Sequence, residues 1–247
     1  MSLVQHVYKI LLDALFPLSP EERVLFSYSP EKAYGELPRA PRHVQTEIPS
    51  IFAYKDERVA KLVWNIKYKK SNHALAIGGY AVYQELIKLP ECMPLSSKQE
   101  MLQVHQLTTS FGLEESGTYP LSSSIILIPI PITAKRRRER GFNQCELLLK
   151  EVERLDIHKN FIIRNDVLIR THHNERQTLK DREHRLKDAR GIFSVHEKVL
   201  ADIISTNTSP LFIVIDDVIT TGSTMTEAMA TLKKAGCTNV RGVSLAH

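Results

Sequence analysis

The sequence predicts an α/β fold with a mainly parallel β-sheet and helices on both of its faces. One observation is a set of three apolar runs, at residues 124–132, 161–170 and 211–216, with a final strand expected at 239–247. The other observation is helical periodicity between these strands, at 142–154 and 223–235. Strands that are apolar on both sides and alternate with helices are typical of a parallel sheet covered on both faces.

The N-terminal part of the chain predicts a smaller and less regular unit. Apolar residues at helical spacing predict a helix over 5–16, and the prolines, serines and charges of 27–50 predict irregular structure. We therefore assign 1–50 to an N-terminal helix and irregular segment, and 51–247 to the main domain. The polar stretch 90–123 is longer than most loops of compact domains, so we expect a surface insertion there.

Composition narrows the class of protein. A chain of 247 residues can form one sizeable domain or one domain with a small appendage. No apolar run approaches the roughly 20 residues of a membrane span, and Lys9 and Asp13 within the N-terminal stretch favour an amphipathic helix over a secretory signal. Three widely spaced cysteines give neither a disulfide framework nor a zinc site, so we expect a cytoplasmic protein. The net charge of +5 permits an acidic ligand or nucleic acid without requiring either.

The stretch VIDDVITTGSTM, residues 214–225, ends an apolar run with two adjacent carboxylates and continues with small hydroxyl residues. In parallel sheets, ligands bind outside the carboxyl ends of the strands. Gly222 allows a sharp turn, and the N–H groups at the start of the next helix suit a phosphate. Asp216 and Asp217 suit ribose hydroxyls or a magnesium ion with its water shell. The loop therefore predicts a ribose 5-phosphate site; the alternative is a helix N-cap with two solvated aspartates.

This order of four apolar residues, two acids, two apolar residues and TTGST resembles the signature of type I phosphoribosyltransferases. Those proteins bind phosphoribosyl pyrophosphate (PRPP) with Mg²⁺, and the resemblance implies their fold for the predicted sheet. It also implies that Asp216 and Asp217 are catalytic residues that face the ribose hydroxyls and hold Mg²⁺, directly or through water. The residues that would bind the 5-phosphate are Thr220, Thr221, Gly222, Ser223 and Thr224.

A second strand-to-helix connection carries a basic run. The segment IPIPITAKRRRERGFNQ, residues 128–144, places five positive charges before a glycine and a helix. Arginine side chains can bind pyrophosphate through paired N–H donors, so Lys135, Arg137 and Arg140 are candidate pyrophosphate ligands. The alternatives are a solvated helical face and a track for the phosphates of DNA.

The same segment resembles the ComF family (competence protein F), whose members share a proline-rich strand end followed by RGFNQ. The resemblance covers about 51–247 and includes 52–70, 170–193 and the closing VRGVSLAH. Many members carry an N-terminal four-cysteine zinc knuckle, which is lacking here because residues 1–91 contain no cysteine. The resemblance implies a role in DNA uptake during natural transformation, near single-stranded DNA and helicase-type partners.

Three functions stay open on this basis. The protein could be a transferase that acts on PRPP and an unidentified acceptor, a non-enzymatic factor associated with single-stranded DNA, or a PRPP-sensing regulator.

Two further groups of residues are candidates for a role in these functions. In type I phosphoribosyltransferases a mobile loop closes over PRPP, and here Gln177, Arg182 and Arg185 are candidates for that lid. Trp64 and Tyr68 stand four residues apart on a predicted helix, where we expect core packing, with base stacking as the alternative.

Overall fold

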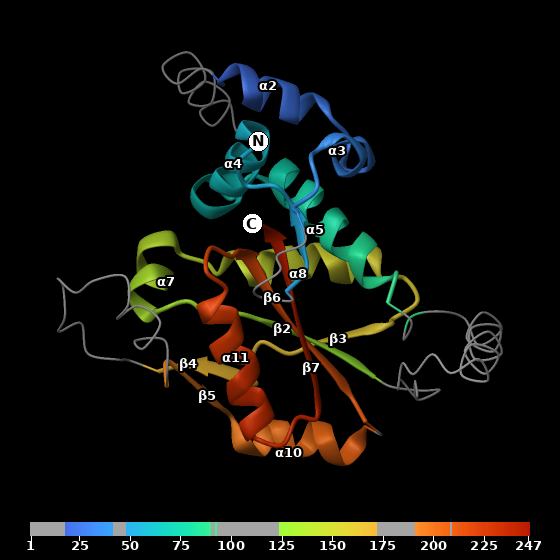
Figure 1. Ribbon diagram of the computed structural model, residues 1–247, viewed down its shortest axis with the longest axis vertical. Coiled ribbons are helices and arrows are strands. Elements are labelled where there is room, and N and C mark those ends of the chain that lie inside the picture. Colours follow the sequence, from blue (N-terminus) through green and yellow to red (C-terminus); the bar gives the residue numbers. More distant parts are fainter. Residues whose placement is uncertain (1–17, 42–47, 90–91, 93–123, 172–190, 208) are drawn as a thin grey trace, which may run out of the picture.

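The structure, a computed structural model, describes residues 18–41, 48–89, 92, 124–171, 191–207 and 209–247. Its centre is a five-stranded sheet in the order β1-β7-β6-β2-β3, in which every neighbouring pair is parallel (Figure 1). The strands are β1 (Ser50–Phe52), β2 (Ile125–Pro129), β3 (Phe161–Ile163), β6 (Leu211–Val218) and β7 (Asn239–Ala246). A second, antiparallel sheet pairs β4 (Leu168–Arg170) with β5 (Phe193–Val195).

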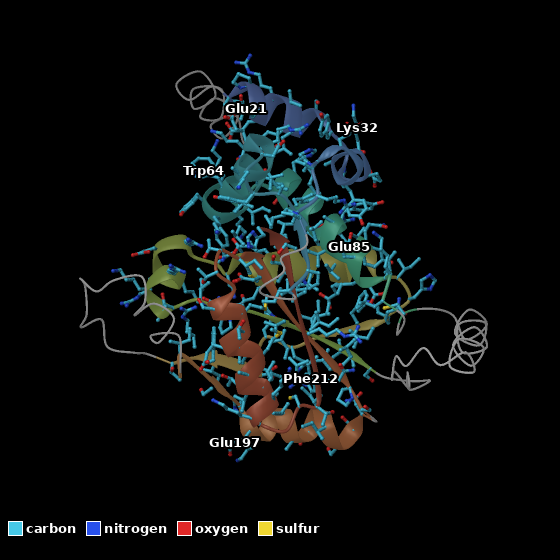
Figure 2. The ribbon with its side chains drawn as sticks, in the orientation of Figure 1. Glu21, Lys32, Trp64, Glu85, Glu197 and Phe212 are labelled. Carbon is cyan, nitrogen blue, oxygen red and sulfur yellow. The ribbon has the colours of Figure 1, made fainter. Side chains whose placement is uncertain are left out.

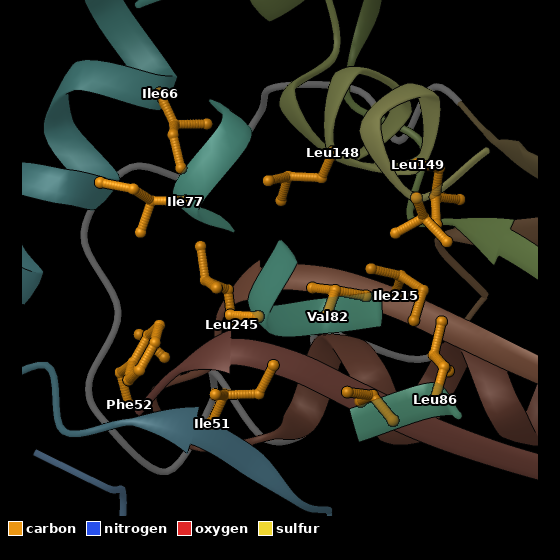
Figure 3. Packing of buried hydrophobic residues seen from close by; sticks show 14 of the residues in the cluster. Ile51, Phe52, Ile66, Ile77, Val82, Leu86, Leu148, Leu149, Ile215 and Leu245 are labelled. Carbon is orange, nitrogen blue, oxygen red and sulfur yellow. The ribbon is translucent and has the colours of Figure 1, made fainter. Parts of the chain in front are cut away.

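Helices cover both faces of the main sheet. Alternate residues of one strand enter different cores: Ile125 and Leu127 join the cluster under α5 and α8, whereas Ile126 and Ile128 join the cluster under α10 and α11. The helices are α5 (Asn72–Leu86), α8 (Gln144–Leu155), α10 (Glu197–Thr206) and α11 (Ser223–Lys234). Figure 3 shows the first core, in which side chains from β1, β6 and β7 meet those of the covering helices. The predicted α/β class is confirmed, and the architecture is consistent with a phosphoribosyltransferase-like fold.

The N-terminal residues form a helical layer above the first core. It contains α2 (Pro20–Ser27), α3 (Pro30–Glu36) and α4 (Glu57–Trp64), and α4 continues as a π-helical turn, η1 (Asn65–Lys69). Irregular structure was expected over 27–50, but α3 forms there because Ser29 caps it and Pro30 occupies its first turn. Leu25 and Ala33 of this layer are fully buried in the same core as α5.

Two further expectations need correction. The apolar run 161–170 does not form one strand, since it divides into β3 of the main sheet and β4 of the small sheet. The basic run, which we placed in the connection between β2 and the next helix, forms a short helix of its own, α7 (Ala134–Arg140), whose N-cap is Thr133. The predicted helix over 5–16 lies outside the described residues, as do nearly all of the insertion at 90–123 and the lid candidates Gln177, Arg182 and Arg185.

Across the described ranges, we find no helix with the length and apolar character that a membrane span requires.

Candidate functional site

Two connections meet at the carboxyl ends of β6 and β2, which are neighbours in the sheet. Pro129 lies opposite Ile215 in the parallel register, and the N–H of Ile130 donates to the carbonyl of Ile215 at 2.9 Å. The next residues of β6 are Asp216 and Asp217, and the chain after β2 leads into α7. The sequence motifs therefore lie side by side at the edge of the sheet where ligands of parallel α/β proteins bind.

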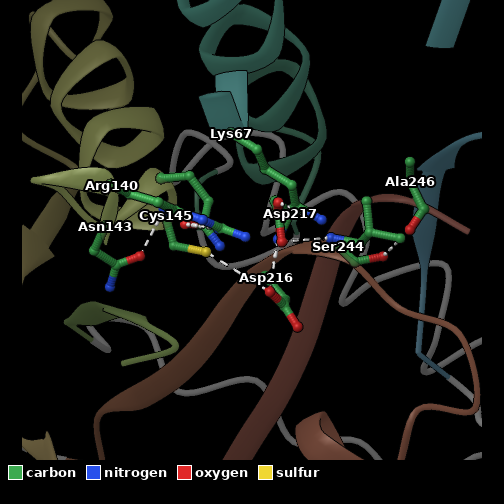
Figure 4. A network of polar contacts seen from close by, with 10 residues as sticks. Lys67, Arg140, Asn143, Cys145, Asp216, Asp217, Ser244 and Ala246 are labelled. Atoms are coloured by element: carbon green, nitrogen blue, oxygen red, sulfur yellow. Dashed lines mark hydrogen bonds and ion pairs between the residues drawn. The ribbon is translucent and has the colours of Figure 1, made fainter. Parts of the chain in front are cut away.

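Asp216 and Asp217 are buried at this edge, with only 9% and 3% of their surface exposed. Asp216 Oδ1 accepts from the N–H of Asp217 at 2.8 Å and lies 3.7 Å from the Cys145 thiol on α8. Asp217 Oδ1 accepts from the N–H of Val218 at 2.9 Å, and Asp217 Oδ2 forms an ion pair with Lys67 Nζ at 3.0 Å. Figure 4 shows the two carboxylates between α8 and the helical layer that carries Lys67.

Burial makes the Asp216 carboxylate costly to ionise. Burial, followed by the charge of Asp217, raises the pKa of the Asp216 carboxyl to about 8, although the ammonium of Lys67 opposes the rise. Burial also raises the pKa of the Cys145 thiol well above its usual range, and both aspartates add to the effect. The thiol therefore stays protonated and can donate to Asp216.

The donor set fits a hard divalent cation. Carboxylate oxygens are the ligands that Mg²⁺ takes from proteins, and Asp216 and Asp217 offer them within 4.8 Å of each other and of the Cys145 sulfur. A protonated thiol is not a ligand for Mg²⁺, so Cys145 supports Asp216 rather than the metal. Asp217 Oδ2 is buried and accepts no well-directed hydrogen bond, although Lys67 Nζ lies 3.0 Å away. One carboxylate oxygen thus retains the capacity to bind a cation.

The hydroxyl residues follow the aspartates in a tight turn. Gly222 is the N-cap of α11 with φ of 74°, and no side chain caps the helix. The hydroxyls of Thr221 and Ser223 lie 2.9 Å apart, and Thr221 is exposed. A pocket of about 50 Å³ is lined by Asp216 and by 218–225. The uncapped helix start and the clustered hydroxyls have the composition of an anion site.

The basic connection is more open. All of α7 is exposed except Arg140, which is partly buried. Arg137 pairs with Glu146 of α8, whereas Arg140 Nη1 donates to Gln144 at 3.1 Å and its guanidinium lies 5.1 Å from the Tyr68 ring centroid. Figure 4 shows Arg140 near Cys145 and the aspartates. Of the three candidate pyrophosphate ligands, only Arg140 is partly buried, whereas Lys135 and Arg137 are exposed.

Sequence reasoning missed two basic residues at this edge. Lys67 belongs to η1 and reaches Asp217. Arg170 at the end of β4 donates to the carbonyl of Pro131 at 3.4 Å, and burial lowers the pKa of its guanidinium. The basic sequence NIKYKK was the available signal for Lys67, but its partner stands far away along the chain.

The expectation that Trp64 and Tyr68 pack in the core is wrong. They expose 43% and 59% of their surface, and their ring centroids lie 5.9 Å apart. Figure 2 labels Trp64 at the periphery of the helical layer, while Phe212 lies inside the main sheet. We call this exposed pair the aromatic ledge. The apolar residues of α4 that do face the core are Val59, Leu62 and Val63.

Comparison with known proteins finds two competence proteins among the relatives. The chain is 35% identical over 136 residues to Competence protein F of Haemophilus influenzae, and this matched region is 53% of each chain. It is 30% identical over 133 residues to Competence protein ComFC of Bacillus subtilis, which covers 54% of this chain and 48% of the relative. The chain thus spans about half the length of the curated relatives it matches. No family model matches the sequence.

Proposed function

Since the two competence relatives support the assignment of this chain to the ComF family, we propose that it binds PRPP with Mg²⁺ at the carboxyl edge of its sheet. The proposal rests on one observation: a single continuous site contains both carboxylates and a hydroxyl-rich turn. Two buried carboxylates and a hydroxyl-rich turn follow one another, and Asp216 lines the same pocket as that turn. A ribose 5-phosphate offers hydroxyl donors to the first part and an anion to the second.

Each group in the site has a defined task in this proposal. Asp216 and Asp217 accept hydrogen bonds from the ribose hydroxyls and hold Mg²⁺, directly or through its water shell. The 5-phosphate is bound by the backbone and hydroxyls of Thr220, Thr221, Gly222, Ser223 and Thr224. Arg140 binds the pyrophosphate, held by Gln144 and the Tyr68 ring. Mg²⁺, when bound, neutralises charge on the pyrophosphate.

The proposal extends to turnover only if an acceptor exists. In a transferase, the ribose would develop positive charge at its anomeric carbon while pyrophosphate departs, and the buried aspartates would stabilise that charge. A PRPP-sensing regulator would keep the same site without turnover. Pyrophosphate release from PRPP, measured with a panel of nucleobases and amines, separates the two: release with any acceptor marks an enzyme, and binding without release marks a sensor.

Thermal unfolding tests PRPP binding directly. PRPP with Mg²⁺ should raise the melting temperature, because a ligand at a hundredfold excess over its Kd stabilises the native state by about 2.7 kcal/mol. Ribose 5-phosphate should raise it less, since it lacks the pyrophosphate. A folded sample with no shift at millimolar PRPP and Mg²⁺ contradicts the proposal.

A second candidate function, binding of single-stranded DNA, is favoured by the aromatic ledge. Lys69 Nζ lies 4.9 Å from the Trp64 ring centroid and Arg140 Cζ lies 5.1 Å from that of Tyr68. The other cations of α7 are exposed and precede Arg140 in the same helix. Exposed aromatic rings beside a basic track are the elements with which proteins stack bases and follow a phosphate backbone, and stacking contributes about 1–3 kcal/mol per base.

The single tryptophan of the chain makes this candidate easy to test. Selectively excited tryptophan fluorescence reports on Trp64 alone, so an oligothymidylate that stacks on the ledge should quench it. Tyr68→Ala should weaken oligonucleotide binding, whereas Tyr54→Ala, which removes a tyrosine of similar exposure (42%), should not. Binding that leaves Trp64 fluorescence unchanged would rule out the ledge as the stacking surface.

A further inference from the structure

Lys67 directly follows two residues that are anchored in the fold, Asn65 and Ile66. The neighbouring Asn65 is 1% exposed, and its Nδ2 donates to Glu22 Oε1 at 2.8 Å and to the carbonyl of Lys61 at 2.9 Å. Ile66 is fully buried in the core. These contacts fix the backbone of η1, a π-helical turn of the kind that is rare and often found at functional sites. The direction of the Lys67 side chain is therefore set by the fold.

This side chain ends at the acidic pair. Lys67 Nζ lies 3.0 Å from Asp217 Oδ2, and the two side chains are only 22% and 5% exposed. The same Asp217 oxygen accepts no well-directed hydrogen bond, as shown above. The Lys67 ammonium thus faces an Asp217 oxygen that accepts no well-directed hydrogen bond. Mg²⁺ or a ribose hydroxyl would need the same oxygen.

We infer that Lys67 is a resident counter-ion of the site, which neutralises Asp217 in the ligand-free protein and must leave it before a divalent cation can bind. The inference rests on the proposed function for the identity of that cation. Two cations compete for one carboxylate oxygen, so Lys67 weakens the binding of Mg²⁺ alone. PRPP brings phosphate groups that can accept the displaced ammonium, so PRPP and Mg²⁺ should bind cooperatively.

The inference separates three roles for Lys67 by the direction of their effects. A purely structural ion pair stabilises the fold and leaves Mg²⁺ affinity unchanged when it is removed. A lysine that only binds phosphate leaves the stability of the free protein unchanged. A resident counter-ion affects both the stability of the free protein and its affinity for Mg²⁺. Its removal lowers the stability of the free protein and tightens the binding of Mg²⁺ alone.

The experiment uses the full chain with Lys67→Met, which keeps an unbranched side chain of similar length without its charge. Melting temperatures are measured in EDTA, in a titration of Mg²⁺ alone, and in PRPP with and without Mg²⁺. We expect a lower melting temperature in EDTA, an Mg²⁺ affinity increased about tenfold, which corresponds to about 1.4 kcal/mol, and a weaker coupling between PRPP and Mg²⁺. The matched control is Lys88→Met, which removes a lysine 3.1 Å from Glu85 outside the site and should leave both ligands unaffected.

Each outcome decides between the inference and the proposed function. If the wild type binds PRPP with Mg²⁺ but Lys67→Met does not bind Mg²⁺ more tightly, the inference is wrong and the proposed function stands. If neither protein responds to Mg²⁺ or PRPP, both are wrong. Should Lys67→Met fail to fold, Lys67→Gln, which keeps a hydrogen-bond donor without the charge, is measured in the same way and judged by the same outcomes.

Discussion

The two connections at the carboxyl edge of the sheet differ in how they present their charges. Segment 216–224, which comprises the end of β6 and the turn after it, holds its carboxylates below one tenth exposure and surrounds them with a thiol, a lysine and backbone N–H groups. The connection after β2 places its charges on α7, where six of seven residues are exposed. Buried charges interact strongly and with few geometries, whereas exposed charges are screened by solvent and salt.

Because of this difference, the two connections should respond differently to single substitutions. In segment 216–224 a single substitution should change one specific interaction by a large amount. On α7 several cations contribute similarly to any long-range attraction of phosphates, and Arg140 differs from them in being partly buried against Gln144 and the Tyr68 ring. Single substitutions in each connection test this contrast.

Asp216→Asn should reduce PRPP affinity by at least about a hundredfold, since a hydrogen bond to a charged group contributes about 1.5–3 kcal/mol and the carboxylate makes more than one. The same substitution should not destabilise the free protein above neutral pH, because the buried carboxylate is costly to ionise there. Calorimetry and thermal unfolding measure the two effects. The control Asp166→Asn changes a carboxylate with 53% side-chain exposure and should leave PRPP affinity intact.

Arg140→Ala should weaken PRPP binding by about 1.5–3 kcal/mol, the range for hydrogen bonds to charged groups. Arg136→Ala, on the exposed part of α7, should weaken it little. For single-stranded DNA both substitutions should act alike, and each should reduce the slope of log affinity against log salt by about 0.7. Equal, small losses of PRPP affinity at both positions would show that α7 is a solvated face and that Arg140 is not a pyrophosphate ligand.

A glycine with positive φ stands in each connection and allows a matched comparison. Gly222 has φ of 74° and Gly141 has φ of 78°. Alanine at either position should cost about 1–2 kcal/mol of stability, the usual penalty of a left-handed conformation. Only Gly222→Ala should also weaken PRPP binding, because Gly222 lines the pocket beside Asp216. Equal losses of PRPP affinity in the two variants would mean that strain, rather than the phosphate turn, explains the effect.

The pH dependence of stability tests the burial of Asp216. The folded-state pKa of Asp216 is raised from 3.8 to about 8, so the folded protein binds the proton more tightly than the unfolded chain. Stability from this group is therefore present below about pH 4 and is lost as pH rises toward 8, with a slope of at most about 1.4 kcal/mol per pH unit. Denaturant unfolding in EDTA should show this decline in the wild type and less of it in Asp216→Asn. The same pH profile in both proteins would contradict the assignment to Asp216.

Patterns local in sequence predicted most of the fold and the centre of the site. Apolar runs identified β2 and β6, because strands buried on both faces have no polar side. The order of acids, hydroxyls and glycine identified segment 216–224, in which the acids lie at the end of β6 and the hydroxyls in the turn after it. Helix α7 entered the sequence analysis only as the alternative of a solvated helical face, because its residues are nearly all charged and give no hydrophobic periodicity. Helix α3 was not predicted, although Ser29 followed by Pro30 is a typical N-cap and first helical residue.

Contacts between distant segments could not be predicted in this way. Lys67 meets Asp217 only because η1 packs over the end of β6, and nothing in either segment specifies the other. The same holds for the Cys145 thiol, which reaches Asp216 from the first turn of α8. The exposure of Trp64 and Tyr68 depends on how α4 and η1 sit on the core, and helical spacing alone did not give their direction.

Calorimetric titration of the full chain with PRPP, in the presence and absence of Mg²⁺, tests the central claim most directly because it requires no knowledge of the acceptor. The proposed site predicts one molecule bound per chain, tighter binding with Mg²⁺ than without it, and loss of binding in Asp216→Asn but not in Asp166→Asn. Absence of binding heat at millimolar PRPP with Mg²⁺ at more than one temperature, in a sample shown to be folded, would contradict the account. Binding that persists undiminished in Asp216→Asn would also contradict it.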